Sequence, residues 1–371
     1  MVTAGDASGS GGRFLTHGHP GPLEWVTRAV VHERPAHALL LVGPRGVGKT
    51  TLALDLAAGL LCLALDPAAR PCRACTACRK VGSGDHPDLH LIEPTGAGEQ
   101  IRLAQVQQLA ADLSLLAMEG RFRVAIVVAA HRLNPDAQNA LLKTLEEPGA
   151  ATCLVLCADD AAPLLPTVLS RMARLRLAAL PVERLADLLV ADGRADRAQS
   201  RALAISAAGR PGLAFRLSSR PEAILARSRM ARTLLDLTGA DRRSRLAAAD
   251  DLIADGAALD AALRGEVVGS SARLQPVERR RAVTCVLEVW RDLGRDLAVA
   301  AHGRRGIRDL DLLEELLSVA AHMDAQALHR SLDRLDRLIV AIEGYASPEL
   351  TLDTLLLTWP RSGAMPSTRV A

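Results

Sequence analysis

The chain has 371 residues, of which 49% are hydrophobic, so it can form two or three domains with substantial cores. Aromatic residues make up only 2%, which argues against a surface that stacks single-stranded bases, and the net charge of +3 allows nucleic-acid contact only through a local patch. No apolar run reaches the length of about 18 residues that a membrane-spanning helix needs. We therefore expect no membrane partner and a cytoplasmic protein whose seven cysteines are reduced.

The two ends of the chain are rich in small and polar residues. The first of them is Gly- and Ser-rich and lacks the apolar segment of a signal peptide. We predict a disordered leader over residues 1–19 and a disordered tail over residues 361–371.

A phosphate-binding loop follows the first predicted strand. The apolar run 39–42 predicts a buried strand, and residues 51–61 predict a helix. The segment between them has the spacing of a P-loop, in which backbone N–H groups face phosphate oxygens, a Lys binds the outer phosphates and a Thr binds Mg²⁺. We expect ATP with Mg²⁺ as its ligand, and a Gly-rich turn without a ligand is the alternative. The predicted binding residues are Gly43, Pro44, Arg45, Gly46, Val47, Gly48, Lys49, Thr50 and Thr51.

Four cysteines gather directly after this helix, in an insertion over residues 62–80. Cys72, Cys75 and Cys78 have the spacing C-x2-C-x2-C, and Cys62 lies at the end of the helix. Four thiolates close a tetrahedral zinc site and leave no position for a reacting water, so the pattern predicts a structural zinc ion. Free cysteines and a redox pair are the alternatives. The remaining cysteines lie in apolar runs and are expected to be unreactive core residues: Cys153, Cys157 and Cys285.

Strand and helix patterns continue to alternate up to residue 177. Apolar runs predict further strands at 89–92, 124–128, 153–157 and 175–177. Apolar residues at helical spacing predict helices at 101–118, 137–147 and 166–171. Unbroken apolar strands are typical of parallel strands buried on both faces. The fold class is therefore α/β, with a doubly wound parallel sheet.

The strand at 124–128 ends without acidic residues. In a P-loop ATPase this strand carries an acidic pair that orients the magnesium shell and polarises the attacking water. Val128 and Ala129 occupy those positions here, and His131 follows as a weaker candidate for a base. Because Ala cannot accept a proton, we expect nucleotide binding with little or no hydrolysis.

Strand patterns nearly vanish after Pro181. Predicted helices at 182–191, 197–207 and 211–217 indicate a small helical domain over residues 178–220. The next region, residues 221–360, is predicted to be an all-α domain. Its amphipathic stretches are 223–237, 243–263, 276–298, 309–321 and 324–343.

A longer motif connects these features to a known family. The run Gln-Asn-Ala-Leu-Leu-Lys-Thr-Leu-Glu-Glu-Pro at 138–148 resembles the signature helix of bacterial clamp-loader AAA+ subunits. Ser170-Arg171-Met172 resembles the family's Ser-Arg-Cys, and His86-Pro87-Asp88 and the inserted cysteines also fit the family. The resemblance covers residues 20–220. The remaining helical region resembles the family's oligomerising collar only in being all-helical.

The resemblance implies an architecture, a function and partners. It implies an AAA+ nucleotide-fold domain over residues 20–177, a lid over 178–220 and a collar over 221–360. It also implies a subunit of a DNA-directed DNA polymerase holoenzyme, DNA polymerase III, that helps to load a sliding clamp onto primed DNA. The implied partners are gamma/tau-type and delta-type clamp-loader subunits in a hetero-pentamer, the sliding clamp and primer–template DNA.

Arg171 is the residue to which the resemblance gives a catalytic role. In ring-shaped AAA+ assemblies, the Arg after that Ser points at the nucleotide of the neighbouring subunit. A guanidinium suits this role because it stays charged and offers a planar fork to phosphate oxygens. We expect Arg171 to act in trans as an arginine finger, and an ordinary surface Arg is the alternative.

Departures from the motor subunits of the family bring the chain closer to the delta-prime type. The gamma/tau motors keep Asp-Glu at the strand end. Their sensor Thr aligns with Ala158-Asp159, and their lid sensor Arg aligns with 209–212, where Arg210 is displaced by two positions. Met172 replaces the usual Cys. An active gamma/tau-like ATPase motor is the alternative function, and a zinc-containing nucleic-acid binder is a third, which the composition disfavours.

Overall fold

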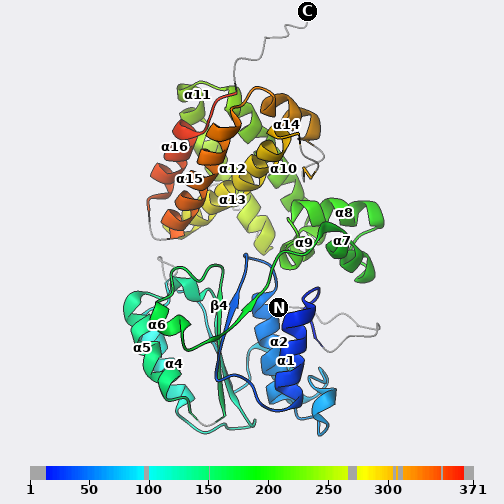
Figure 1. The fold of residues 1–371 in the computed structure, drawn as a ribbon, viewed down its shortest axis with the longest axis vertical. Helices are drawn as coiled ribbons and strands as arrows, with labels where there is room; N and C mark the ends of the chain where they lie inside the picture. Colours follow the sequence, from blue (N-terminus) through cyan, green and yellow to red (C-terminus); the bar gives the residue numbers. More distant parts are fainter. Residues whose placement is uncertain are drawn as a thin grey trace, which may run out of the picture. The chain divides into compact units, whose positions relative to one another are not determined.

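The computed structural model of the protein describes residues 14–95, 100–149, 151–265, 274–303, 306–307, 312–343 and 346–362 (Figure 1). Residues 1–13 of the predicted leader and 363–371 of the predicted tail lie outside the described residues.

The described part of the predicted leader, residues 14–19, contacts the first compact part of the chain. The backbone N–H groups of Leu15 and Thr16 donate to the Asp55 carboxylate at 3.0 and 2.8 Å, and the ring of His19 lies 3.0 Å from the Val47 carbonyl oxygen. These partners come from the P-loop and its helix, so local composition did not predict them.

The chain divides into two compact units. The first comprises residues up to 192 together with 209–213, and the second comprises 193–208 and the residues from 214 onward. The division runs through the lid expected at 178–220. Helix α7 (Val182–Ala191) falls in the first unit and α8 (Arg197–Ser206) in the second, and α9 (Pro211–Ser218) continues from the first into the second.

The first unit contains a five-stranded parallel sheet with the strand order β2-β3-β4-β1-β5. This confirms the α/β fold class. The strand order reverses beside β1, where a doubly wound sheet opens its binding crevice. The bounds are β1 (Ala38–Val42), β2 (Leu89–Ile92), β3 (Arg123–Val127), β4 (Thr152–Ala158) and β5 (Ala173–Arg176).

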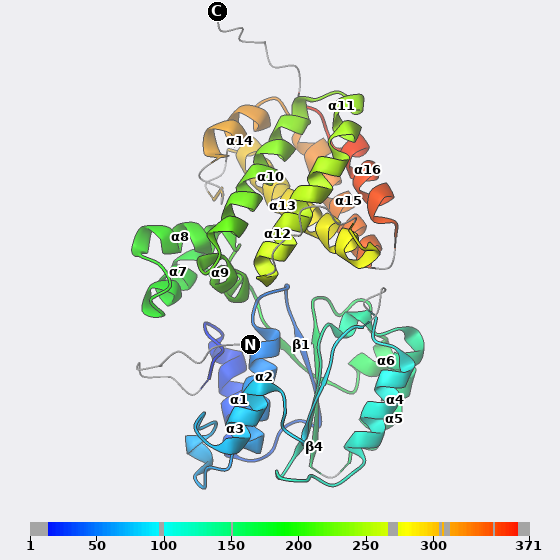
Figure 2. The same ribbon diagram turned by 180° about the vertical axis from the view of Figure 1, so that it is seen from behind.

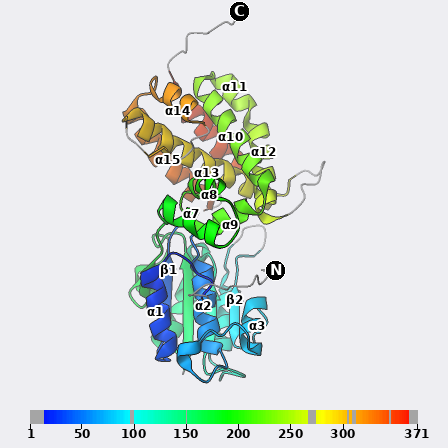
Figure 3. The same ribbon diagram turned by 90° about the vertical axis from the view of Figure 1, so that its right-hand side faces the viewer.

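Helices cover both faces of this sheet. On one face, α1 (Pro20–Val31) and α2 (Lys49–Leu61) form a core with the odd-numbered residues of β1, and Figure 3 looks onto this face. On the other face, α4 (Leu103–Leu113), α5 (Pro135–Glu146) and α6 (Pro166–Leu169) pack on Ala38 and Leu40 of the same strand. Each fully buried Leu contributes about 1.5–3 kcal/mol to folding, which explains why the strands read as unbroken apolar runs.

Helix α4 is shorter than the sequence pattern predicts. The expected helix extended to Met118, but α4 ends at Leu113 and Leu115, Leu116 and Met118 are exposed. The backbone N–H of Met118 donates to the buried carboxylate of Asp88 at 2.6 Å. That partner, 30 residues away, holds the chain in a turn where periodicity alone favoured a helix.

The second unit is helical, and α13 runs among its other helices (Figure 2). Trp290 of α13 packs against Trp359 with ring centroids 5.2 Å apart. Buried Arg245 donates to the carbonyl oxygens of Leu237 and Leu356 at 2.8 and 3.2 Å and so ties three helices together. The helices are α10 (Pro221–Gly239), α11 (Arg242–Ala247), α12 (Ala249–Arg264), α13 (Pro276–Ala301), α14 (Leu313–Ala320), α15 (Ala325–Glu343) and α16 (Pro348–Thr358).

In the part of the chain that the structure describes, no helix is both long enough and apolar enough to cross a membrane.

Candidate functional site

The P-loop has the strand–loop–helix geometry that its sequence predicts. The loop leaves β1 after Val42, and α2 begins at Lys49, with Gly48 as its N-cap at φ 109°. A side chain at Gly43 would place its Cβ 2.0 Å from the Leu177 carbonyl oxygen, so only Gly fits there. All the predicted loop residues therefore lie together, at the carboxyl edge of the parallel sheet.

Lys49 is held inside the loop. Its Nζ donates to the carbonyl oxygens of Gly43 and Pro44 at 2.5 and 3.0 Å and to Asp159 Oδ1 at 2.7 Å. Its side chain is 8% exposed, whereas that of Asp159 is 31% exposed. An ammonium group has three N–H donors, so each of them has a partner within the protein.

Two further segments contact the P-loop. The Gly212 N–H donates to the Gly46 carbonyl oxygen at 2.8 Å, and the His19 ring contacts the Val47 carbonyl oxygen. Gly212 has little room for a side chain, since a Cβ there would lie 2.9 Å from the Gly46 oxygen. Arg210, the displaced sensor candidate, is buried.

The end of β3 carries apolar residues, as its sequence indicates. Ala129 adopts φ 55° and precedes a short 3₁₀ turn that contains His131. Burial lowers the pKa of His131, so the ring is neutral near pH 7. Its Nδ1 accepts the backbone N–H of Asp159 at 3.2 Å, which leaves the ring proton on Nε2. His131 therefore contacts Asp159, and its Nδ1 lone pair is already used in that contact.

Arg171 lies in the short connection between α6 and β5. Its guanidinium donates to Glu146 Oε1 at 2.7 Å and to the Thr167 carbonyl oxygen at 2.9 Å. Its side chain is 36% exposed and that of Glu146 is 52% exposed, so the ion pair is accessible to solvent. The two residues line an open surface depression with His37, Leu145, Ser170 and Met172.

Arg171 and the P-loop belong to opposite edges of the sheet. Strands β1 and β5 are parallel, with Leu39 beside Ala173 at the amino edge and Val42 beside Arg176 at the carboxyl edge. Arg171 precedes Ala173, whereas the P-loop follows Val42. Three residues of strand span about 10 Å, so Arg171 cannot reach the phosphate position of its own chain.

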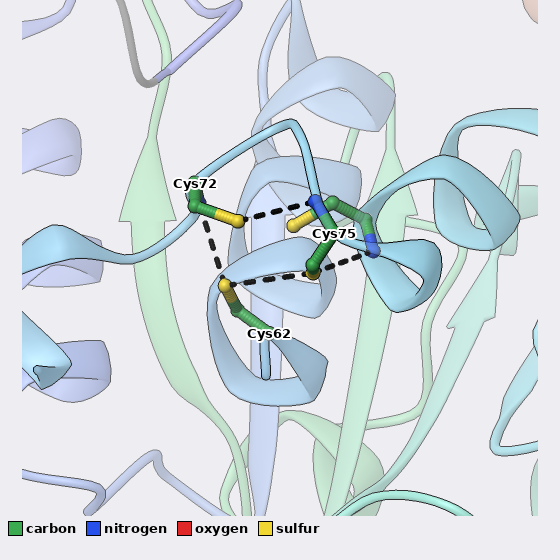
Figure 4. Close-up of side chains that lie close together, drawn as sticks. Cys62, Cys72 and Cys75 are labelled. Atoms are coloured by element: carbon green, nitrogen blue, oxygen red, sulfur yellow. Dashed lines mark hydrogen bonds between the residues drawn. The ribbon is translucent and has the colours of Figure 1, made fainter. Parts of the chain in front are cut away.

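The four inserted cysteines converge on one point, and Figure 4 shows Cys62, Cys72 and Cys75 of this cluster. Their sulfur atoms all lie within 4.8 Å of one another, and the Sγ atoms of Cys62 and Cys75 are 4.0 Å apart. A tetrahedral zinc ion with Zn–S bonds of about 2.3 Å would need S···S distances of about 3.8 Å. The thiols are free and the site is partly buried, so the cluster could hold a metal ion.

Backbone N–H groups around the cluster favour thiolates. The N–H of Cys75 donates to Cys72 Sγ, and that of Cys78 donates to Cys75 Sγ, each at 3.4 Å. Burial acts to raise the pKa of Cys72, but the N–H donors of Cys75 and Ala74 outweigh it and lower that pKa to about 6. Burial raises the pKa of Cys62 and Cys78, so a metal ion must displace protons from these thiols.

A buried carboxylate that the sequence did not reveal connects the cluster to the P-loop helix. Asp55 of α2 is fully buried and accepts the guanidinium of Arg73 as well as the N–H groups of Leu15 and Thr16. Arg73 lies between two of the cysteines in the chain. The sequence did contain a signal for this contact, because Asp55 stands alone among apolar residues of its helix. A carboxylate that is buried in this way needs polar partners.

The core cysteines have no comparable environment. Burial raises the pKa of Cys153 and Cys157 to about 12, which keeps both thiols protonated. Cys285 is buried in α13.

Comparison with known proteins finds relatives for the first half of the chain. The family model described as "DNA polymerase III, delta subunit" matches residues 18–181. The delta' subunit of Bacillus subtilis is 35% identical over 171 residues, which are 46% of this chain and 51% of that subunit. The delta' subunit of Pseudomonas aeruginosa is 43% identical over 136 residues, which are 37% of this chain and 41% of that subunit. Residues 18–181 of the chain are thus similar to clamp-loader delta' subunits.

The similarity has clear bounds. The chain spans about half the length of the delta' relatives, and the tau subunit of Escherichia coli, at 38% identity over 149 residues, matches 40% of this chain and 23% of its own length. A gamma subunit-related protein of Thermotoga maritima covers 90% of this chain and 97% of its own, with a TM-score of 0.38 and 16% identity. The RuvB branch-migration motor of the same organism covers 84% and 91%, with a TM-score of 0.39 and 18% identity.

Proposed function

We propose that this chain is a clamp-loader subunit of the delta-prime type, which helps to load a sliding clamp onto primed DNA. It would assemble with gamma/tau-type and delta-type subunits in a hetero-pentamer and supply Arg171 to the ATPase site of a neighbour. Residues 178–220 would act as its lid and residues 221–360 as its oligomerising collar.

The separation of Arg171 from its own P-loop is the observation that carries this proposal. An arginine finger acts on the phosphates of another subunit, so it must face away from the nucleotide site of its own chain. The ion pair with Glu146 does not oppose this role. Exposed ion pairs are worth only about 0–1 kcal/mol, so a phosphate group can replace the Glu146 carboxylate as the partner of the guanidinium.

The P-loop would bind nucleotide with little or no hydrolysis. Its backbone geometry supports binding, and the apolar end of β3 lacks the carboxylates that an ATPase uses to hold Mg²⁺ and activate water. The rival function, a gamma/tau-like motor, needs a base at this position. His131 is a poor candidate because its Nδ1 already accepts the Asp159 N–H.

Zinc would hold the cysteine cluster together as a structural ion. The four sulfur donors leave no open coordination position, so the ion would take no part in phosphate chemistry. It would instead fix the insertion against α2, next to the contact between Arg73 and Asp55.

The test is the ATPase activity of a reconstituted clamp loader that contains this chain or its Arg171→Ala variant. A finger accelerates phosphoryl transfer at the site it serves by about a thousandfold or more. The total clamp- and DNA-stimulated rate should therefore fall without vanishing, because other sites in the ring keep their own fingers. Arg171→Lys should restore little, since Lys keeps the charge but loses the planar fork.

Arg174→Ala is the matched control. Arg174 is an exposed arginine three residues away, and it donates to the Leu169 carbonyl oxygen at 2.9 Å. Its variant should assemble normally and keep the wild-type rate. Equal ATPase rates for wild type and Arg171→Ala, at matched assembly, would reduce Arg171 to a surface residue.

A further inference from the structure

The residue just beyond β4 lies at the entrance to the P-loop. In the sheet, Val42 pairs with Ala158, and the Gly43 N–H donates to the Ala158 carbonyl oxygen at 3.2 Å. Asp159 is therefore the first residue past the strand, next to the first residue of the loop. Its Oδ1 accepts a hydrogen bond from Lys49, the residue type that reaches the outer phosphates in a nucleotide-bound P-loop.

Asp159 competes with phosphate for Lys49. In a nucleotide-bound P-loop the lysine reaches the β- and γ-phosphates. Here Lys49 makes its three hydrogen bonds to two loop carbonyl oxygens and to Asp159 Oδ1. An incoming phosphate must displace at least one of them, and the carboxylate also repels phosphate oxygens because both are negative.

His131 holds Asp159 in this position from the other side. Its Nδ1 accepts the Asp159 N–H, and its Nε2 lies 4.0 Å from Asp159 Oδ2. The imidazole is buried and neutral, so it orients Asp159 without cancelling its charge. Mg²⁺ would be the usual means of neutralising a terminal phosphate, but the end of β3 has no carboxylate to hold that ion.

We infer that Asp159 sets the nucleotide preference of this P-loop, so that it binds a nucleoside diphosphate more tightly than a triphosphate. The inference rests on the nucleotide-binding half of the proposed function. Repulsion between Asp159 and phosphate is greatest for the phosphate farthest from the loop's backbone amides, which is the third one. The α- and β-phosphates still meet the N–H groups at the start of α2.

The test uses the full-length chain and a fluorescent ADP analogue, displaced in turn by ADP and by ATP, with Mg²⁺ and with a chelator. Wild type should bind ADP more tightly than ATP. Asp159→Asn should tighten ATP binding by about tenfold or more, the scale expected when a like charge a few ångströms away is removed, and tighten ADP binding less. Asp159→Thr should act in the same direction.

Asp160→Asn is the matched control, because Asp160 is an exposed neighbouring carboxylate whose contact is the Ala162 N–H at 3.1 Å. It removes the same charge and should leave both affinities unchanged. Unfolding midpoints check that every variant is folded.

Several results would overturn the inference. Unchanged ATP affinity in both Asp159 variants would mean that the ion pair does not limit binding. Weaker ATP binding only with Mg²⁺ would make Asp159 a metal-shell residue. No binding by any variant would remove both this inference and the nucleotide half of the proposed function. The proposed role of Arg171 would not be affected, because the ATPase assay of the clamp loader tests it separately.

Discussion

Asp88 is a fully buried carboxylate that holds the turn at residues 118–120, which lies 30 residues further along the chain. It accepts the backbone N–H groups of Met118, Glu119 and Gly120 at 2.6, 2.8 and 2.7 Å. Burial by itself would raise the pKa of Asp88, but these donors outweigh it and hold the pKa below its usual value. In the sequence, Asp88 was only part of a family motif, whereas in the structure it determines where α4 ends.

Asp88→Asn should destabilise the protein by about 1–3 kcal/mol, because the amide leaves buried N–H donors without acceptors. The measurement is the free energy of unfolding in urea at pH 7, with the exposed Asp85→Asn as control. The folded pKa is depressed, so the stabilisation is present above the unfolded value of about 3.9 and is lost as the pH falls through the folded pKa. The difference between wild type and Asp88→Asn should accordingly shrink below about pH 4. A difference that stays constant through that range would show that the charge of Asp88 is not what stabilises the turn.

At the scale of elements, α2 is the connection between the two candidate sites of the first unit. Its first residue is Lys49 of the P-loop, and Cys62 follows its last turn. Asp55, halfway along, contacts Arg73 of the cysteine insertion. The insertion itself includes a helix that sequence reasoning did not predict, α3 (Thr76–Ser83), capped by the Cys75 sulfur. Metal binding there should stabilise the end of the P-loop helix.

One zinc ion per chain is expected in protein purified without chelator. Cys75→Ser should lower zinc affinity by more than about a hundredfold, since losing a ligand should cost more than losing an outer-shell partner. The unfolding midpoint should fall with it, because metal binding and local folding are coupled. Elemental analysis beside thermal unfolding measures both, and Cys285→Ala, which removes a buried thiol elsewhere, should keep the metal. Much less than one zinc in wild type would rule out the site.

At the scale of the whole molecule, the two ends of the parallel strands carry different candidate residues in the first unit. The P-loop occupies the carboxyl edge and Arg171 the amino edge. A unit of this kind can receive a finger at one edge and provide one at the other, which is the arrangement of a head-to-tail interface. Because the end of β3 has no carboxylates, the proposed function assigns an active role only to the edge that carries Arg171.

The isolated full-length chain should therefore hydrolyse ATP far more slowly than about one per second, the lower range for ordinary enzymes. Steady-state phosphate release measures this, with Lys49→Ala as the background control. Turnover near one per second that disappears in Lys49→Ala would favour the gamma/tau-like motor. In that case the base would have to come from outside the end of β3.

The sequence by itself determined the features that depend on short spacing. The P-loop, the apolar central strands and the cysteine cluster are each specified by residues close together in the chain. Their local patterns therefore predicted the α/β class, and the residues of each motif lie together in the structure. The motif around Arg171 likewise predicted its position before β5.

Only the tertiary structure decided which distant polar groups meet. Asp159 reaches Lys49 across 110 residues, and Asp88 reaches Met118 across 30. Helical periodicity wrongly extended α4 because it contains no information about such a partner. The division of the chain within the expected lid depends in the same way on contacts between distant segments. Buried charges must find partners wherever the fold places them, so these residues acquire their roles only when the sheet has formed.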